Sequence, residues 1–180
     1  MYGMIHNAVR DLVLEQHGPA VWDSVLAESG VGEDAFLAMQ PYDDDVVLSL
    51  VQSTANALGA SVGDCLEQFG IFWILHTARN NYGPLLFGFG PTIWDLLKHL
   101  DHMHDRLSSS FPGYDAPSFI LTQRSDARYE LQYRSNRTGL VPFVIGLLKG
   151  LSVLFETPLR ISLIKNETDQ LGQFCVFLLD

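Results

Sequence analysis

One histidine, His104, lies on an otherwise apolar stripe of a helix predicted over residues 93–109. At about 100° per residue, its neighbours on the stripe are aliphatic or aromatic, namely Ile93, Leu97, Leu100, Leu107 and Phe111. His99 and His102 point to the opposite side of the helix, where we expect solvent. A buried imidazole needs a partner, because an unsatisfied ring nitrogen costs on the order of 1–3 kcal/mol.

Spacing alone leaves two interpretations of His104 open. The first is a core histidine whose ring hydrogen-bonds a backbone carbonyl. The second is an axial metal ligand, in which one ring nitrogen binds the metal and a separate acceptor orients the other. A zinc site from His99, His102 and His104 is disfavoured, because the three side chains do not converge on one helical face.

A strand predicted within residues 127–137 presents three anion-binding groups at two-residue steps. Alternation places the phenol of Tyr133, the hydroxyl of Ser135 and the guanidinium of Arg137 on one face. The planar arginine fork matches a carboxylate, although a strand-end arginine can equally pair with a surface aspartate. Together with His104 and abundant apolar surface, the set favours a flat apolar ligand with carboxylates, which is the shape of haem.

The segment at residues 133–137 resembles the Tyr-x-Ser-x-Arg signature of H-NOX (haem nitric oxide/oxygen binding) domains, the haem sensor domains of soluble guanylate cyclase and its bacterial relatives. Four further segments resemble the family in the same order: MYGMIHNAV, LDHMHDRL, YDAPSF and GLVPFVIGLLKGL. The likeness therefore covers essentially the whole chain, as a single domain over residues 1–180, of the bacterial stand-alone type.

This resemblance implies a set of roles around haem b (iron protoporphyrin IX). His104 resembles the proximal iron ligand. Tyr133, Ser135 and Arg137 resemble the clamp that holds the haem propionates. Pro117 resembles a proline that presses on the macrocycle and distorts it, and Ile5 resembles a residue of the distal wall.

The distal side is expected to decide which gas is preferred. Oxygen-binding members of the family have a distal tyrosine, and Phe143 corresponds to that position here. Bound dioxygen gains from a hydrogen-bond donor, whereas NO and CO depend on one much less, so the resemblance implies an NO (and CO) sensor. Trp73 lies on the helix that approaches the distal face; we expect it to pack, although its indole N–H could donate to a ligand.

The expected function is gas sensing without catalysis: NO weakens the Fe–His104 bond, and the change is reported to a separate partner. Stand-alone bacterial members usually report to a histidine kinase or a cyclic-di-GMP enzyme. One alternative is a haem carrier or trafficking protein, which would share the pocket. Another is a haem peroxidase, for which His76 is the candidate distal acid–base group.

Composition excludes several classes of partner. A formal net charge of −10 argues against binding to nucleic acid, which needs basic side chains, and against docking on anionic lipid. Two cysteines, Cys65 and Cys175, are too few for a disulfide scaffold and favour the cytoplasm. No signal-peptide pattern occurs at the N-terminus, and the apolar segment 140–155 is too short to span a membrane.

The pattern along the chain predicts an α+β fold, with a helical N-terminal subdomain, a C-terminal four-stranded antiparallel sheet with helices, and haem buried between them. The expected helices cover 2–17, 21–27, a stretch after 43–45, 61–78, 93–109 and 140–155. A segment broken by glycine and proline is expected at 80–92. After Pro112-Gly113 the sequence pattern changes from helical to strand-like. The expected strands are 118–123, 127–133, 159–165 and 173–179, the last two joined by a turn at 166–172.

The acidic run Asp43, Asp44 and Asp45 precedes one of these helices. Carboxylates are stabilised at a helix N-terminus, so a solvated helix start is expected there. Cation binding is the alternative. The solvated helix start is the favoured interpretation.

Overall fold

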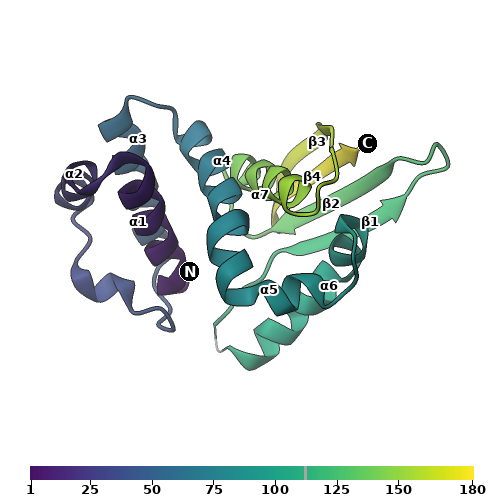
Figure 1. The fold of residues 1–180 in the computed structure, drawn as a ribbon, viewed down its shortest axis with the longest axis horizontal. Coiled ribbons are helices and arrows are strands. Elements are labelled where there is room, and N and C mark those ends of the chain that lie inside the picture. The colour runs from purple at the N-terminus through teal and green to yellow at the C-terminus, as the bar shows by residue number, and fades with distance from the viewer. Residues whose placement is uncertain (112) are drawn as a thin grey trace.

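The computed structural model describes residues 1–111 and 113–180; Pro112, at the predicted change of character, lies outside the described residues. Helices come first along the chain and a sheet with one inserted helix follows (Figure 1). The helical elements are α1 (Gly3–His17), α2 (Pro19–Ser29), η1 (Glu33–Phe36), α3 (Asp44–Leu58), α4 (Val62–Phe72), the π-helix η2 (Trp73–Ala78), α5 (Arg79–Phe87), α6 (Ile93–Ser110) and α7 (Val141–Leu154). The strands are β1 (Ser118–Gln123), β2 (Tyr129–Ser135), β3 (Ile161–Asp169) and β4 (Gly172–Leu179).

Helices α1, α2 and α3 form a bundle at one end of the molecule, and the sheet lies at the other end (Figure 1). Val13, Val25 and Leu50 are fully buried in the bundle, where burial of apolar area is the main stabilising term. Helix α4 runs between the bundle and the sheet (Figure 1). Its position means that one helix contacts both parts of the fold.

The sheet has four strands in the order β1-β2-β4-β3, and every neighbouring pair is antiparallel. Leu131 on β2 and Phe177 on β4 are fully buried partners in the register. Side chains on one face of the sheet pack against helices, as the alternation along β2 and β4 requires. The predicted α+β class and the four-stranded antiparallel sheet are therefore confirmed.

Glycines allow α4 and α7 to cross with their backbones in close contact. A Cβ atom built on Gly146 would lie 2.1 Å from the carbonyl oxygen of Glu67, and one on Gly70 would lie 2.3 Å from the carbonyl oxygen of Phe143. Real Cβ atoms do not approach this closely, so neither position tolerates a side chain without movement of the helices. This crossing sets where Trp73, just after α4, and Phe143 lie.

Side-chain hydrogen bonds cap the starts of α4 and α6. Ser61 accepts a hydrogen bond from the backbone N–H of Asp64 and so caps α4, as predicted. Thr92 and Asp95 form a reciprocal capping box at the start of α6, close to the predicted position.

Two segments predicted as loops are shorter in the structure. The segment predicted as broken, 80–92, is helical as far as Phe87, where α5 ends. Within it the backbone is non-helical only at Tyr82, two residues before Pro84. The proline therefore kinks the helix and does not end it. The predicted turn 166–172 is shorter, because β3 pairs with β4 as far as Asp169↔Gly172. Gly172 has φ 100°, which glycine adopts easily and which permits the tighter hairpin.

Among the helices of the described part, none alone is long and apolar enough to cross a bilayer. One pair bent by 111°, Asp44–Leu58 with Val62–Phe87, passes by length and composition only.

Candidate functional site

His104 lies in α6 with one ring nitrogen already held. Its Nδ1 is 3.1 Å from the carbonyl oxygen of Pro117, and the side chain is half-buried, less than its apolar stripe predicts. Burial lowers the pKa of His104, while the hydrogen bond to Pro117 acts in the opposite direction. The neutral imidazole that results is the form that binds metals, and with Nδ1 engaged the metal-binding atom would be Nε2.

Contacts between α6 and β1 fix this arrangement. Oδ1 of Asp101 accepts a hydrogen bond from the backbone N–H of Phe119 at 2.9 Å, one turn from His104. The segment around Pro117 is thereby held beside the imidazole. His99 and His102 are exposed, as predicted, and Nδ1 of His99 contacts the carbonyl of Asp95 on its own helix.

Tyr133 and Ser135 are buried on β2, with relative exposures of 2% and 5%. Their side chains share a hydrogen bond, and burial raises the pKa of Tyr133, so its phenol stays protonated and can donate. The strand ends at Ser135, so Arg137 lies in the following loop and does not continue the predicted strand face. The hydroxyl of Ser135 instead accepts a hydrogen bond from the backbone N–H of Arg137 at 3.1 Å.

Arg137 is held from two sides. Its Nε donates to Oδ2 of Asp44 at 2.5 Å, and its Nη1 donates to the carbonyl of Asp115 at 2.7 Å. The amino group of Met1 donates to Oδ1 of Asp44 at 2.7 Å. The pairing of the arginine with an aspartate, one of the sequence-based alternatives, is therefore present in the structure.

Asp44 corrects the expectation for the acidic run 43–45. Asp43 and Asp45 are exposed as a solvated helix start should be, but Asp44 is half-buried and paired. Burial raises the pKa of Asp44, and the contacts with the Met1 amino group and Arg137 outweigh that effect and hold it below its ordinary value. A cavity of about 210 Å³ adjoins this ion pair, lined by Met1, Asp44, Leu48, Asn136, Arg137, Thr138 and Leu140.

The ring of Phe119 connects the histidine with the strand residues. Its centroid is 5.8 Å from that of His104 and 5.1 Å from that of Tyr133. The predicted proximal residues thus form a continuous set that runs from α6 through β1 to β2 and the loop after it. The set consists of His104, Pro117, Tyr133, Ser135 and Arg137.

The predicted distal residues gather around Phe69. The Phe69 ring stacks on Phe143 at 5.0 Å and meets Trp73 edge-on at 6.4 Å. Ile5 packs against the same apolar cluster. Trp73 packs against the clusters of both the bundle and the sheet, and it begins a π-helix, a feature frequent at functional sites.

His76, the candidate for a peroxidase, lies outside both sets. Its ring stacks on Phe72 at 4.3 Å, and its Nδ1 is 3.5 Å from a carboxylate oxygen of Glu15 on α1. Its side chain is 43% exposed. Another cavity, of about 370 Å³, lies among α1, α3 and α4 and touches none of the predicted site residues. Neither feature supports acid–base chemistry at the candidate site.

Two contacts at the candidate site were not predicted from the sequence. Asp44 holds Arg137, and Asp101 holds the backbone beside Pro117. Aspartates at helix starts and on exposed helical faces are common, so residue type gave no signal for either. Each partner lies far along the chain or in a loop, and only the tertiary fold brings the pairs together.

The donor set fits haem better than a bare metal ion. Among the described residues, no group of three or more His, Cys, Asp or Glu side chains is placed to hold a metal. One neutral imidazole with an available Nε2 suits an iron that already has four porphyrin nitrogens. Phenol, hydroxyl and guanidinium groups suit the two carboxylates of the same molecule.

The helical bundle, the four-stranded sheet and the donor set of His104, Tyr133, Ser135 and Arg137 are the combination expected of a haem-binding domain. The family model described as Haem-NO-binding matches residues 2–163, so the chain belongs to the haem-NO-binding, or H-NOX, family. Domains of this family bind haem and act as gas sensors, not as catalysts themselves.

Curated relatives are much longer proteins. Soluble guanylate cyclase gcy-33 of Caenorhabditis elegans is 30% identical over 184 residues, which cover 99% of this chain and 19% of that protein. Soluble guanylate cyclase 89Da of Drosophila melanogaster is 27% identical over 146 residues, which cover 81% of this chain and 22% of that protein. The chain therefore spans about a fifth of the length of these relatives.

Solved structures show the same fold. An H-NOX protein from S. oneidensis in the Fe(II)NO state matches with a TM-score of 0.86 and 21% identity, covering 100% of this chain and 98% of that one. An oxygen-binding H-NOX domain related to soluble guanylate cyclases matches with a TM-score of 0.87 and 19% identity, covering 100% and 94%.

Proposed function

We propose that this chain senses NO, and also binds CO, at ferrous haem b held by His104. Ferrous haem, when bound, supplies the iron to which a diatomic gas binds. The observation that carries the proposal is the hydrogen bond from His104 Nδ1 to the Pro117 carbonyl, which fixes the ring and leaves Nε2 for the iron. Membership of the haem-NO-binding family supports the cofactor.

Tyr133, Ser135 and Arg137 are proposed to hold the haem carboxylates. The first two are buried donors at the end of β2, and the third adds a positive charge beside a cavity. Charge-assisted hydrogen bonds of this kind are stronger than neutral ones. Pro117 would contact the macrocycle from the same loop that orients His104.

The selectivity for NO and CO is proposed to follow from the apolar distal group. Phe143 is stacked on Phe69, and Trp73 packs beside them. Aromatic rings of phenylalanine offer no hydroxyl to a ligand that carries partial negative charge. The absence of a hydroxyl donor would weaken the binding of dioxygen more than the binding of NO or CO.

Signalling is proposed to run through α6. His104 tethers this helix to the cofactor, and Asp101 and Pro117 tether it to the segment leading into β1. If NO weakened the bond of His104 to the iron, α6 would gain freedom relative to the sheet, and the ligand would bias this helix between two states. The receiver is proposed to be a histidine kinase or a cyclic-di-GMP enzyme.

Absorption spectra of the ferrous protein test the proposal directly. We expect the Soret band to shift when NO or CO is added and to keep its position for minutes in air-saturated buffer. A prompt and reversible shift in air would contradict the proposed selectivity. Transfer of haem to an acceptor protein within seconds would contradict the sensor assignment and favour a carrier.

A further inference from the structure

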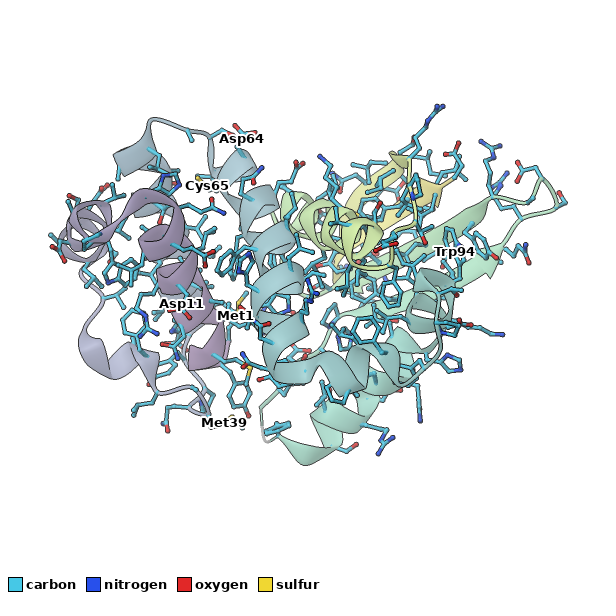
Figure 2. The ribbon with its side chains drawn as sticks, in the orientation of Figure 1. Met1, Asp11, Met39, Asp64, Cys65 and Trp94 are labelled. Carbon is cyan, nitrogen blue, oxygen red and sulfur yellow. The ribbon has the colours of Figure 1, made fainter. Side chains whose placement is uncertain are left out.

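The ion pair between Asp44 and Arg137 joins two distant parts of the fold. Asp44 lies in the first turn of α3, in the helical bundle, whereas Arg137 follows the last residue of β2 in the sheet. The chain begins at the edge of the bundle that faces α4 (Figure 1), and Met1 lies there in Figure 2. Its amino group contacts the same carboxylate, so both oxygens of Asp44 are engaged.

The contacts of Arg137 dictate which of its nitrogens a ligand could use. Nε donates to the carboxylate of Asp44, and Nη1 donates to the carbonyl of Asp115. The nitrogen that a third acceptor would meet is therefore Nη2. An arginine fork held at two of its nitrogens loses rotamer freedom before a ligand arrives, so less entropy is lost when the ligand binds.

We propose that Asp44 is a positioning residue of the carboxylate clamp: it orients Arg137 so that Nη2 meets a haem carboxylate, and it couples that carboxylate to α3. The inference rests on the proposed function, because it takes Arg137 as a clamp residue. Asp44 itself touches no part of the ligand in this account.

The coupling follows from the packing of α3. Val47, Leu50 and Val51 bury one face of this helix in the bundle that also contains α1. Ile5 on α1 packs against the same cluster. A displacement of the carboxylate would thus pass through Arg137 and Asp44 to the bundle that carries the proposed distal wall.

The chain offers matched variants for a test. Asp44→Asn removes the charge and keeps the size, while Asp44→Glu keeps the charge. Asp45→Asn is the control, because Asp45 is the next residue in the same helical turn and is exposed. Two quantities are measured: the rate of haem loss from the ferric protein to excess apomyoglobin, and the ferric/ferrous midpoint potential.

Asp44→Asn is expected to speed haem loss about tenfold, since an arginine released from its carboxylate forfeits a charge-assisted hydrogen bond. It is also expected to raise the midpoint potential, because a negative charge near the haem has been removed. Asp44→Glu should recover most of the potential, and Asp45→Asn should stay within twofold of the wild type in haem loss. A destabilised fold alone would not produce this rescue of the potential by charge.

A double-mutant cycle with Arg137→Met decides whether Asp44 acts through the arginine. We expect Arg137→Met to speed haem loss and Asp44→Asn to add less than twofold in that background. If the two effects multiply, or if Asp44→Asn behaves as the wild type does, the inference is overturned while the proposed function stands. If Arg137→Met leaves haem loss unchanged, the proposed clamp is wrong, and the inference falls with it.

Discussion

The imidazole Nδ1 of His104 lies 3.1 Å from the carbonyl oxygen of Pro117. The hydrogen bond joins the middle of α6 to the residue before β1, and it fixes the tautomer of the ring. A backbone carbonyl cannot be removed by substitution of a side chain, so the orientation of His104 withstands most changes at position 117. The proposed iron ligation by His104 and the proposed contact of Pro117 with the macrocycle can therefore be tested separately.

Replacement of Pro117 by alanine keeps that carbonyl and removes the ring. We expect Pro117→Ala to retain haem and the ligation by His104, and to change the midpoint potential because the macrocycle relaxes toward planarity. Potentiometric titration measures the change. An unaltered potential together with an unaltered Soret band would show that Pro117 does not press on the haem.

A hydroxyl in the distal group should change gas selectivity. Phe143→Tyr places a donor beside Phe69, and we expect the ferrous Soret band to shift reversibly in air in this variant. Phe143→Leu is the control without a hydroxyl and should behave as the wild type does. Equal behaviour of the tyrosine and leucine variants would show that position 143 does not face the gas.

The crossing of α4 and α7 predicts an unusual pair of glycine substitutions. Gly146→Ala should lower the free energy of unfolding by about 1–3 kcal/mol, because its Cβ would lie 2.1 Å from a backbone oxygen. Gly63→Ala, in the first turn of α4, meets only contacts at 3.7 Å and should raise the free energy of unfolding by up to about 0.5 kcal/mol, less than in mid-helix. Urea denaturation gives both values, and equal effects would contradict the close approach.

Buried His6 predicts how stability depends on pH. Its side chain is fully buried, its Nδ1 lies 2.7 Å from the carbonyl of Ala35, and burial lowers its pKa below the ordinary value of 6.5. Below pH 6.5 this histidine binds a proton in the unfolded chain but stays neutral in the folded chain. The free energy of unfolding therefore falls as the pH drops from about 7 to 5. His104 has a lowered pKa too and contributes in the same direction in the absence of haem.

Urea denaturation of the haem-free protein at several pH values measures this dependence. His6→Gln should reduce the slope between pH 7 and 5, because one of the two titrating histidines is gone. His17→Gln, on the exposed end of the same helix, serves as the control and should leave the slope intact. Equal slopes for His6→Gln and His17→Gln would show that His6 does not cause the pH dependence.

The periodicity of the sequence predicted most of the elements, for physical reasons that particular residues show. The apolar stripe of α6 and the Thr92 cap are local, and so are the β-branched and aromatic residues of β1. The errors fell where tertiary contacts override local signals. Pro84 suggested a break, yet the chain continues as a kinked helix, and strand pairing extended β3 through a polar segment.

The candidate site was predictable to the extent that it depends on spacing within one element. Alternation correctly placed Tyr133 and Ser135 on the buried face of β2, and the helical angle separated His104 from His99 and His102. Arg137 lies beyond the strand, where alternation no longer applies. Its partner Asp44 is 93 residues away, and no local rule could connect the two.

The most direct test of the central claim is the resonance Raman spectrum of the ferrous protein, recorded for the wild type, His104→Gly and the control His102→Gly. We predict an iron–imidazole stretching band in the wild type and in His102→Gly. The band should vanish in His104→Gly and return when free imidazole is added. A band that persists in His104→Gly without imidazole would contradict ligation by His104.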